Sequence, residues 1–210
     1  MARAIVMMAH ASTPAMRKGL FPERDETAAL RGQRHAAAFD TESEGLDARA
    51  VEELRAARES EAFVALTSAF VRVYCAPSAI AVASATALGF SSEQITIDGT
   101  LSTPHFGAWA GKSALQIGRD DPAALQAWTR DPYFAPPGGD SFDSVRRRMT
   151  VWLASTMKDD ADTVENGDDA LPILAIASAT VVRAAVLLAR RARLESFHQL
   201  DVAPGAMFVL

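Results

Sequence analysis

Two of the four histidines lie where an imidazole can do chemistry. His10 ends the apolar run that begins at Ala4, and no charged residue lies within five positions of it. A histidine at the carboxyl end of a buried strand lies at the edge where open α/β sheets bind ligands. His105 lies in a Pro- and Gly-bearing loop, Thr100–Gly111. Because an imidazole titrates near neutral pH, His10 and His105 are candidates for general acid–base catalysis.

Each of these histidines also has a purely structural explanation. His10 can simply end a strand, and His105 can be a partly exposed loop residue. His35 and His198 are interpreted as structural or solvated. Two histidines without a nearby carboxylate make a poor metal site, so we expect neither a metal nor another cofactor. The single cysteine, Cys75, is expected to be a small buried thiol.

Composition indicates one globular domain, 1–210, in a reducing compartment. The chain has 210 residues, of which 49% are hydrophobic and 22% charged, with a net charge of -5. This charge argues against nucleic acid as a partner, and the arginine clusters Arg146–Arg148 and Arg190–Arg193 are expected on solvated helix surfaces. No apolar window has the length of a membrane span or a signal segment, so we expect a cytoplasmic location.

Strands are expected to alternate with helices along the chain. The expected strands are Ala4–Met8, Ala69–Cys75, Gln94–Ile97, Leu171–Ala177 and Gly205–Leu210. The expected helices are Leu46–Leu66, Ser78–Leu88, Pro122–Arg130, a long helix from Ser141 to about Lys158, and Thr180–Arg193. Loops are expected over Thr13–Phe21 and Asp159–Asp169, and a charged surface insertion over 23–45. Such alternation predicts a three-layer α/β/α sandwich with a mostly parallel central sheet.

In such a sheet three strand-to-helix junctions meet at one edge. They are Ala9–Ala11, Cys75–Ser78 and Ala177–Thr180, and the loop Thr103–Gly107 is a natural fourth wall. Ser178 begins a helix there, so it can cap that helix or bind a ligand oxygen. The residues alone do not say what fills this pocket.

Five segments resemble, in order, the motifs of the histidine phosphatase superfamily, the phosphoglycerate mutase-like fold. Ala9–Ala11 stands for Arg-His-Gly, and Ala76–Ala81 for Ser-Pro-x-x-Arg-Ala. Leu101–Gly111 keeps Gly-x-Trp-x-Gly, and Pro136–Ser141 stands for Pro-Pro-Gly-Gly-Glu-Ser. Ser178–Arg183 stands for His-Gly-Gly-x-x-Arg. The resemblance covers nearly the whole chain and implies that fold.

The resemblance also implies roles for individual positions. In this family the first histidine carries the phosphoryl group, two arginines and a second histidine clamp its oxygens, and an acid protonates the leaving oxygen. Only the nucleophile position keeps its residue, as His10, and the pocket threonine is kept as Thr13. The two clamping arginines are replaced by Ala9 and Ile80, and the second histidine by Ser178. The acid is replaced by Thr103, and a pocket asparagine by Met16. Arg17, Lys18 and Arg183 remain nearby in sequence, but at no clamp position.

These replacements predict that efficient phosphatase activity is lost, because phosphoryl transfer depends on charge stabilisation of the equatorial oxygens. Three hypotheses follow. The first is a repurposed enzyme that acts on a small, weakly charged metabolite through His10. Whether the chain forms a homodimer is a separate question that the sequence leaves open. The second is a non-catalytic protein that binds a ligand or a protein partner. The third is a weak phosphomonoester hydrolase that forms a phosphohistidine at His10 and holds the anion through Arg17, Lys18 or Arg183.

Overall fold

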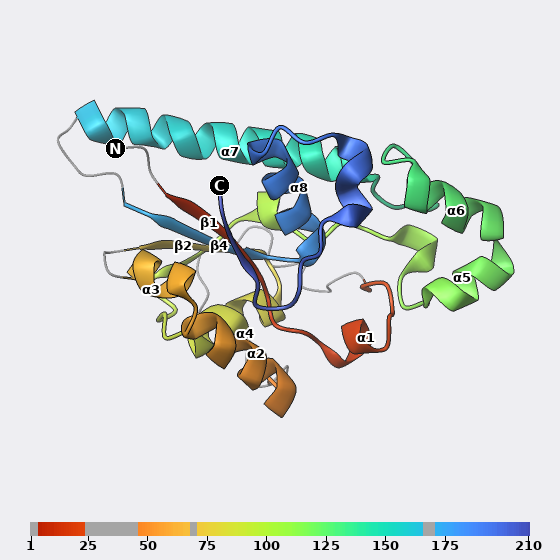
Figure 1. Ribbon diagram of the computed structural model, residues 1–210, viewed down its shortest axis with the longest axis horizontal. Helices are drawn as coiled ribbons and strands as arrows, with labels where there is room; N and C mark the ends of the chain where they lie inside the picture. The colour runs from red at the N-terminus through yellow and green to blue at the C-terminus, as the bar shows by residue number, and fades with distance from the viewer. Residues whose placement is uncertain (1–3, 24–45, 68–70, 166–170) are drawn as a thin grey trace.

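The computed structural model describes residues 4–23, 46–67, 71–165 and 171–210, and the sheet lies at its centre (Figure 1). Its strands are β1 (Ile5–Ala9), β2 (Arg72–Cys75), β3 (Ile95–Ile97), β4 (Ile173–Ala177) and β5 (Met207–Val209), in the order β3-β2-β4-β1-β5. All pairings are parallel except that of β5 with β1. The mostly parallel sheet predicted from the sequence is therefore confirmed.

Helices cover both faces of the sheet, as the apolar strands require. On one face lie α7 (Phe142–Glu165) and α8 (Ala179–Ala189), and on the other α2 (Ala48–Arg58), α3 (Glu61–Thr67) and α4 (Ala79–Ala87) (Figure 1). Every residue of β1 and β4 is buried, which explains why both strands are continuous apolar runs. The helices α5 (Ala114–Asp120) and α6 (Pro122–Arg130) lie together at one end of the molecule (Figure 1).

Short elements build the connections. The helix α1 (Pro14–Arg17) follows β1, and the 3-10 helices η3 (Gly99–Leu101), η4 (Gly107–Trp109) and η5 (Leu194–Gln199) lie in later loops. Around η4 a second, aromatic cluster forms beside α5 and α6. Its buried members are Phe106, Trp109 and Ile117, and the side chains packed against them are Phe21, Ala124, Leu125, Trp128 and Phe134.

Several predicted boundaries are wrong. The helix expected over 46–66 is two helices, and Ser60 between them donates a hydrogen bond to the Ala57 carbonyl and accepts one from the Phe63 N–H. The helix α5, which Ser113 and Gln116 start with a capping box, lies between the expected loop that ends at Gly111 and the expected helix that begins at Pro122, where no element was expected. The helix α7 continues to residue 165 through the expected acidic loop, and α8 ends at Ala189, before the expected end. The expected loop after β1 contains α1, and 24–45 of the expected insertion lie outside the described residues.

Candidate active site

The register of β1 and β4 places His10 and Ser178 at the same edge of the sheet. Ala9 pairs with Ala177, and the His10 N–H donates to the Ala177 carbonyl at 3.0 Å. The third junction joins them, because the Ala76 N–H donates to the Ile176 carbonyl at 2.9 Å. The structure thus brings the three predicted junctions to the carboxyl edge of the parallel strands.

The hydrogen bond made by the His10 ring decides its tautomer. Its side chain is buried, at 6% exposure, and Nδ1 lies 2.9 Å from the Ala11 carbonyl oxygen. A carbonyl oxygen only accepts, so Nδ1 must carry the proton. In the neutral ring Nε2 then holds the lone pair, which is the nitrogen able to take a proton or attack an electrophile.

Ser178 has an arrangement that a simple helix cap does not explain. It begins α8, yet its side chain makes no capping hydrogen bond. Its Oγ is buried and has no hydrogen-bond partner in the described part of the chain, although the residue is only 8% exposed. Backbone N–H groups in the first turn of a helix also lack intrahelical partners. A hydroxyl and helix-end donors are therefore present beside the strand that leads to His10.

The loop from Thr103 to Gly107 is held against the Pro-Pro-Gly-Gly segment. The His105 N–H donates to Asp140 Oδ2 at 2.8 Å, and the Asp140 N–H donates to the His105 carbonyl at 2.7 Å. The Ala108 N–H reaches the Pro137 carbonyl at 2.9 Å. These contacts fix the backbone around the half-buried residues Thr103 and His105. The Gly-x-Trp-x-Gly and Pro-Pro-Gly-Gly segments are thus two sides of one packed contact.

The remaining predicted site residues lie on α1, on α4 and at the end of β1. Thr13 caps α1 by accepting a hydrogen bond from the Met16 N–H at 3.2 Å. Met16 and Ile80 are half-buried, and Ala9 is buried in the sheet. The side chains at these positions carry no charge.

Two arginines of the predicted site region, Arg17 and Arg183, bind protein groups. The Arg17 guanidinium donates to Ser12 and pairs with Asp47. Arg183 Nε donates to the Leu200 carbonyl at 2.8 Å. Burial lowers the pKa of Arg183, and the nearby Asp201 opposes this shift. Lys18 is exposed.

Arg148 departs from the prediction of a solvated helix surface. Its Nη2 donates to the Ser102 carbonyl at 2.5 Å, so Arg148 binds the residue that precedes Thr103. The prediction was wrong here because the face of α7 that packs against the rest of the protein is not determined by the sequence of this arginine cluster alone. Its neighbour Arg147 fits the prediction, with a side chain that is 73% exposed.

Burial strongly raises the pKa of the Cys75 thiol, as expected for a small buried thiol. No group of three or more His, Cys, Asp or Glu side chains that could hold a metal occurs in the part of the chain that the structure describes. In the same ranges no helix is both long and apolar enough to cross a membrane.

Comparison with known sequences decides the family. The profile of the histidine phosphatase superfamily (branch 1) matches residues 26–210. The chain belongs to this superfamily. The match begins after His10, and the pairing of β1 with β4 places His10 at the edge of the sheet.

Curated relatives match over shorter stretches. The bifunctional protein Rv2228c of Mycobacterium tuberculosis is 38% identical over 55 residues, which are 26% of this chain and 15% of that protein. Glucosyl-3-phosphoglycerate phosphatase of Mycolicibacterium vanbaalenii is 31% identical over 105 residues, 50% of this chain and 46% of that protein. The chain thus spans less than half the length of these relatives.

Solved structures agree in fold over nearly the whole chain. A mycobacterial glucosyl-3-phosphoglycerate phosphatase, solved with VO3, superposes with a TM-score of 0.70 at 21% identity, covering 98% of this chain and 90% of that one. A putative alpha-ribazole-5'-P phosphatase of Escherichia coli gives 0.71 at 18% identity, covering 99% and 89%. At these identities the comparison establishes the shared histidine phosphatase fold.

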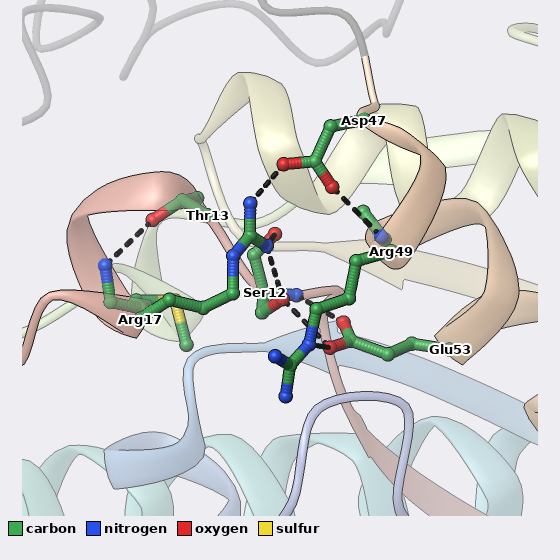
Figure 2. A network of polar contacts seen from close by, with 8 residues as sticks. Ser12, Thr13, Arg17, Asp47, Arg49 and Glu53 are labelled. Atoms are coloured by element: carbon green, nitrogen blue, oxygen red, sulfur yellow. Dashed lines mark hydrogen bonds and ion pairs between the residues drawn. The ribbon is translucent and has the colours of Figure 1, made fainter.

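Sequence reasoning missed Glu53, which accepts hydrogen bonds from Ser12, and Asp47, which pairs with Arg17 (Figure 2). Glu53 carried no signal in the sequence, because it lies within an expected charged helix. Only the docking of α2 against the end of β1 distinguishes it from the exposed acids beside it.

Proposed function

We propose that this superfamily member uses the edge between β1 and β4 to bind a small, weakly charged metabolite, with His10 as acid–base group or nucleophile. The observation that carries the proposal is the buried, unpartnered Ser178 hydroxyl at the junction paired with that of His10. Substrate contacts are assigned to the pocket positions Ala9, Thr13, Met16, Arg17, Ile80, Thr103 and Ser178. A hydroxyl and helix-end N–H groups can donate to a carbonyl, hydroxyl or carboxylate oxygen. The neutral residues Ala9, Ile80 and Ser178 supply no positive charge to balance a phosphate dianion.

The proposed chemistry begins with a neutral His10. Its Nε2 takes a proton from the bound molecule or attacks an electrophilic carbon there, while the bond from Nδ1 to the Ala11 carbonyl keeps the ring oriented. Ser178 Oγ and the first N–H groups of α8 donate to the oxygen on which negative charge develops. His105 is assigned the return of a proton, since its loop is held in place by Asp140.

Loss of efficient phosphatase activity is part of the proposal. Removing one preorganised donor for a developing oxyanion costs roughly 100- to 1000-fold in rate. Here the two arginines, the second histidine and the acid of the superfamily are replaced together, by Ala9, Ile80, Ser178 and Thr103. The contacts of Arg17 and Arg183 with protein groups further support the view that these cations do not replace the clamp.

A second candidate function is favoured by the names of the relatives. A curated protein that is 31% identical over half of this chain is a phosphatase. Under this alternative the chain hydrolyses a phosphomonoester slowly through a phosphohistidine at His10, and Arg17 leaves Asp47 to hold the anion. A non-catalytic binding protein is the third possibility, and it requires no role for the His10 lone pair.

Ligand-dependent thermal shifts separate the proposed function from its alternatives. The panel holds neutral and monocarboxylate metabolites, phosphomonoesters and vanadate, tested on the wild type, His10→Gln and Ser178→Ala. We expect an uncharged or singly charged compound to raise the melting temperature, and each substitution to weaken that binding about tenfold, the value of one or two hydrogen bonds. Stabilisation by phosphomonoesters or vanadate alone would contradict the proposal, and binding unaffected by His10→Gln would favour a non-catalytic role.

A further inference from the structure

The segment that carries His10 is tied to three separate elements through consecutive backbone N–H groups. The His10 N–H binds the Ala177 carbonyl of β4, and the Ala11 N–H binds Ser84 Oγ of α4 at 3.1 Å. The Ser12 N–H binds Glu53 Oε2 of α2 at 2.7 Å. The Ala11 carbonyl, which accepts the bond from the His10 ring, belongs to the same peptide group as the Ser12 N–H.

Glu53 is the centre of a charged network around this peptide (Figure 2). The Ser12 hydroxyl donates to Glu53 Oε1 at 2.7 Å and accepts a hydrogen bond from Arg17 Nη1 at 2.6 Å. Arg49 Nε lies 3.4 Å from Glu53 Oε1 on the solvent side. The Glu53 side chain is only 17% exposed, so its two hydrogen bonds to Ser12 are shielded from water.

Asp47 completes the network from the start of α2. It pairs with Arg17 and accepts a hydrogen bond from the Ala50 N–H at 3.0 Å, as the cap of that helix. The Ala50 N–H and the Arg17 guanidinium hold the pKa of Asp47 below its usual value, so it is ionised at neutral pH. Arg17 therefore joins the two acids of α2 to the segment that follows His10.

A largely buried carboxylate is costly unless its oxygens are hydrogen-bonded. Both carboxylate oxygens of Glu53 accept hydrogen bonds from one residue, Ser12, which lies two positions after His10. A salt bridge that only attached α2 would not need the Ser12 N–H. The bond to that N–H instead orients the peptide plane whose carbonyl binds the His10 ring, which is a positioning task.

We propose that Glu53 is a positioning residue for His10, and that through Ser12 it keeps His10 in the tautomer with the proton on Nδ1. The inference rests on the proposed role of His10, since it concerns the lone pair on Nε2. It adds a group on α2, outside the sheet edge, that controls the chemistry at that edge.

The test compares Glu53→Gln with Glu52→Gln by nitrogen NMR of the histidine rings, with His10→Gln to assign the signal. Glu52 is the matched control, because it is the preceding residue of α2 and pairs with Arg55 on the exposed face. In the wild type and in Glu52→Gln we expect the neutral His10 ring to carry its proton on Nδ1. In Glu53→Gln we expect the ratio of tautomers to move about tenfold toward protonated Nε2, the factor typical of one charge-assisted hydrogen bond.

The same tautomer ratio in Glu53→Gln as in the wild type would overturn the inference, whatever happens to the melting temperature. If Glu53→Gln does not fold, Glu53→Asp replaces it, because the shorter side chain keeps the charge and withdraws the carboxylate from the Ser12 N–H. A folded Glu53→Asp with an unchanged ratio overturns the inference equally. The readout needs no ligand, so a failure of the thermal-shift panel would count against the proposed function and leave this inference standing.

Discussion

At the scale of single residues, environment decides which polar groups can act. His10 is buried with Nδ1 bound, Ser178 is buried with its hydroxyl unpartnered, and Cys75 is kept as a thiol by burial. The sequence predicts the first two as neighbours, because parallel strands end at one edge. It cannot predict Glu53 or Arg148, since their contacts depend on how α2 and α7 dock.

His198 supplies a residue-scale prediction about pH. Burial lowers its pKa, its bond with the Trp128 carbonyl acts in the opposite direction, and Arg183 lowers the pKa further. The unfolded chain therefore takes up a proton as the pH falls below about 6.5, whereas the folded chain does so only at lower pH. Stability is accordingly lost as the pH falls through that window.

His198→Gln keeps a donor for the Trp128 carbonyl and removes the titration. We expect its melting temperature to fall less than that of the wild type between pH 7 and pH 5, with the difference at pH 8 as the reference. The measurement is a pH series of thermal unfolding curves for both proteins. Parallel curves across the series would show that His198 does not contribute.

At the scale of elements, local capping and loop–loop contacts determine the parts of the fold that lie between the long apolar elements. The sequence predicts the long apolar elements, since burial of β1 and β4 produces continuous apolar runs. It fails at α5 and at the break between α2 and α3, where local capping by Ser113 and Ser60 decides the outcome. The contact between the loop of η4 and the Pro-Pro-Gly-Gly segment is the element-scale feature most open to test.

Two glycines of this contact give a matched pair. A Cβ on Gly107, at φ +51°, would lie 2.1 Å from the Pro137 carbonyl oxygen. A Cβ on Gly138, at φ +71°, would meet nothing within 4 Å. We expect Gly138→Ala to lower the free energy of unfolding by about 1 kcal/mol, from backbone strain alone. Gly107→Ala should cost about 3 kcal/mol or more, because the two loops must separate. Urea unfolding of both variants measures the difference, and equal costs would contradict the described packing.

At the scale of the whole molecule, the histidine phosphatase fold supplies the edge and the strand order, and the residues placed there set the chemistry. The mostly parallel sheet was predictable because strands alternate with helices along the chain. The family was predictable because the Gly-x-Trp-x-Gly and Pro-Pro-Gly-Gly segments occur together and in the order of the superfamily motifs. The substrate was not predictable, because Ala9, Ile80, Thr103 and Ser178 are neutral and many small molecules can bind a hydroxyl and a few N–H groups. We propose that this scaffold no longer carries an efficient phosphate clamp.

The rate of hydrolysis of an aryl phosphate tests that claim most directly. The assay compares the wild type, His10→Ala, and a variant that restores the superfamily residues through Ala9→Arg, Ile80→Arg, Thr103→Glu and Ser178→His. We predict that the wild type and His10→Ala hydrolyse the ester at the same background rate, and that the restored variant gains about 100-fold or more. Efficient hydrolysis by the wild type that His10→Ala abolishes would contradict the account.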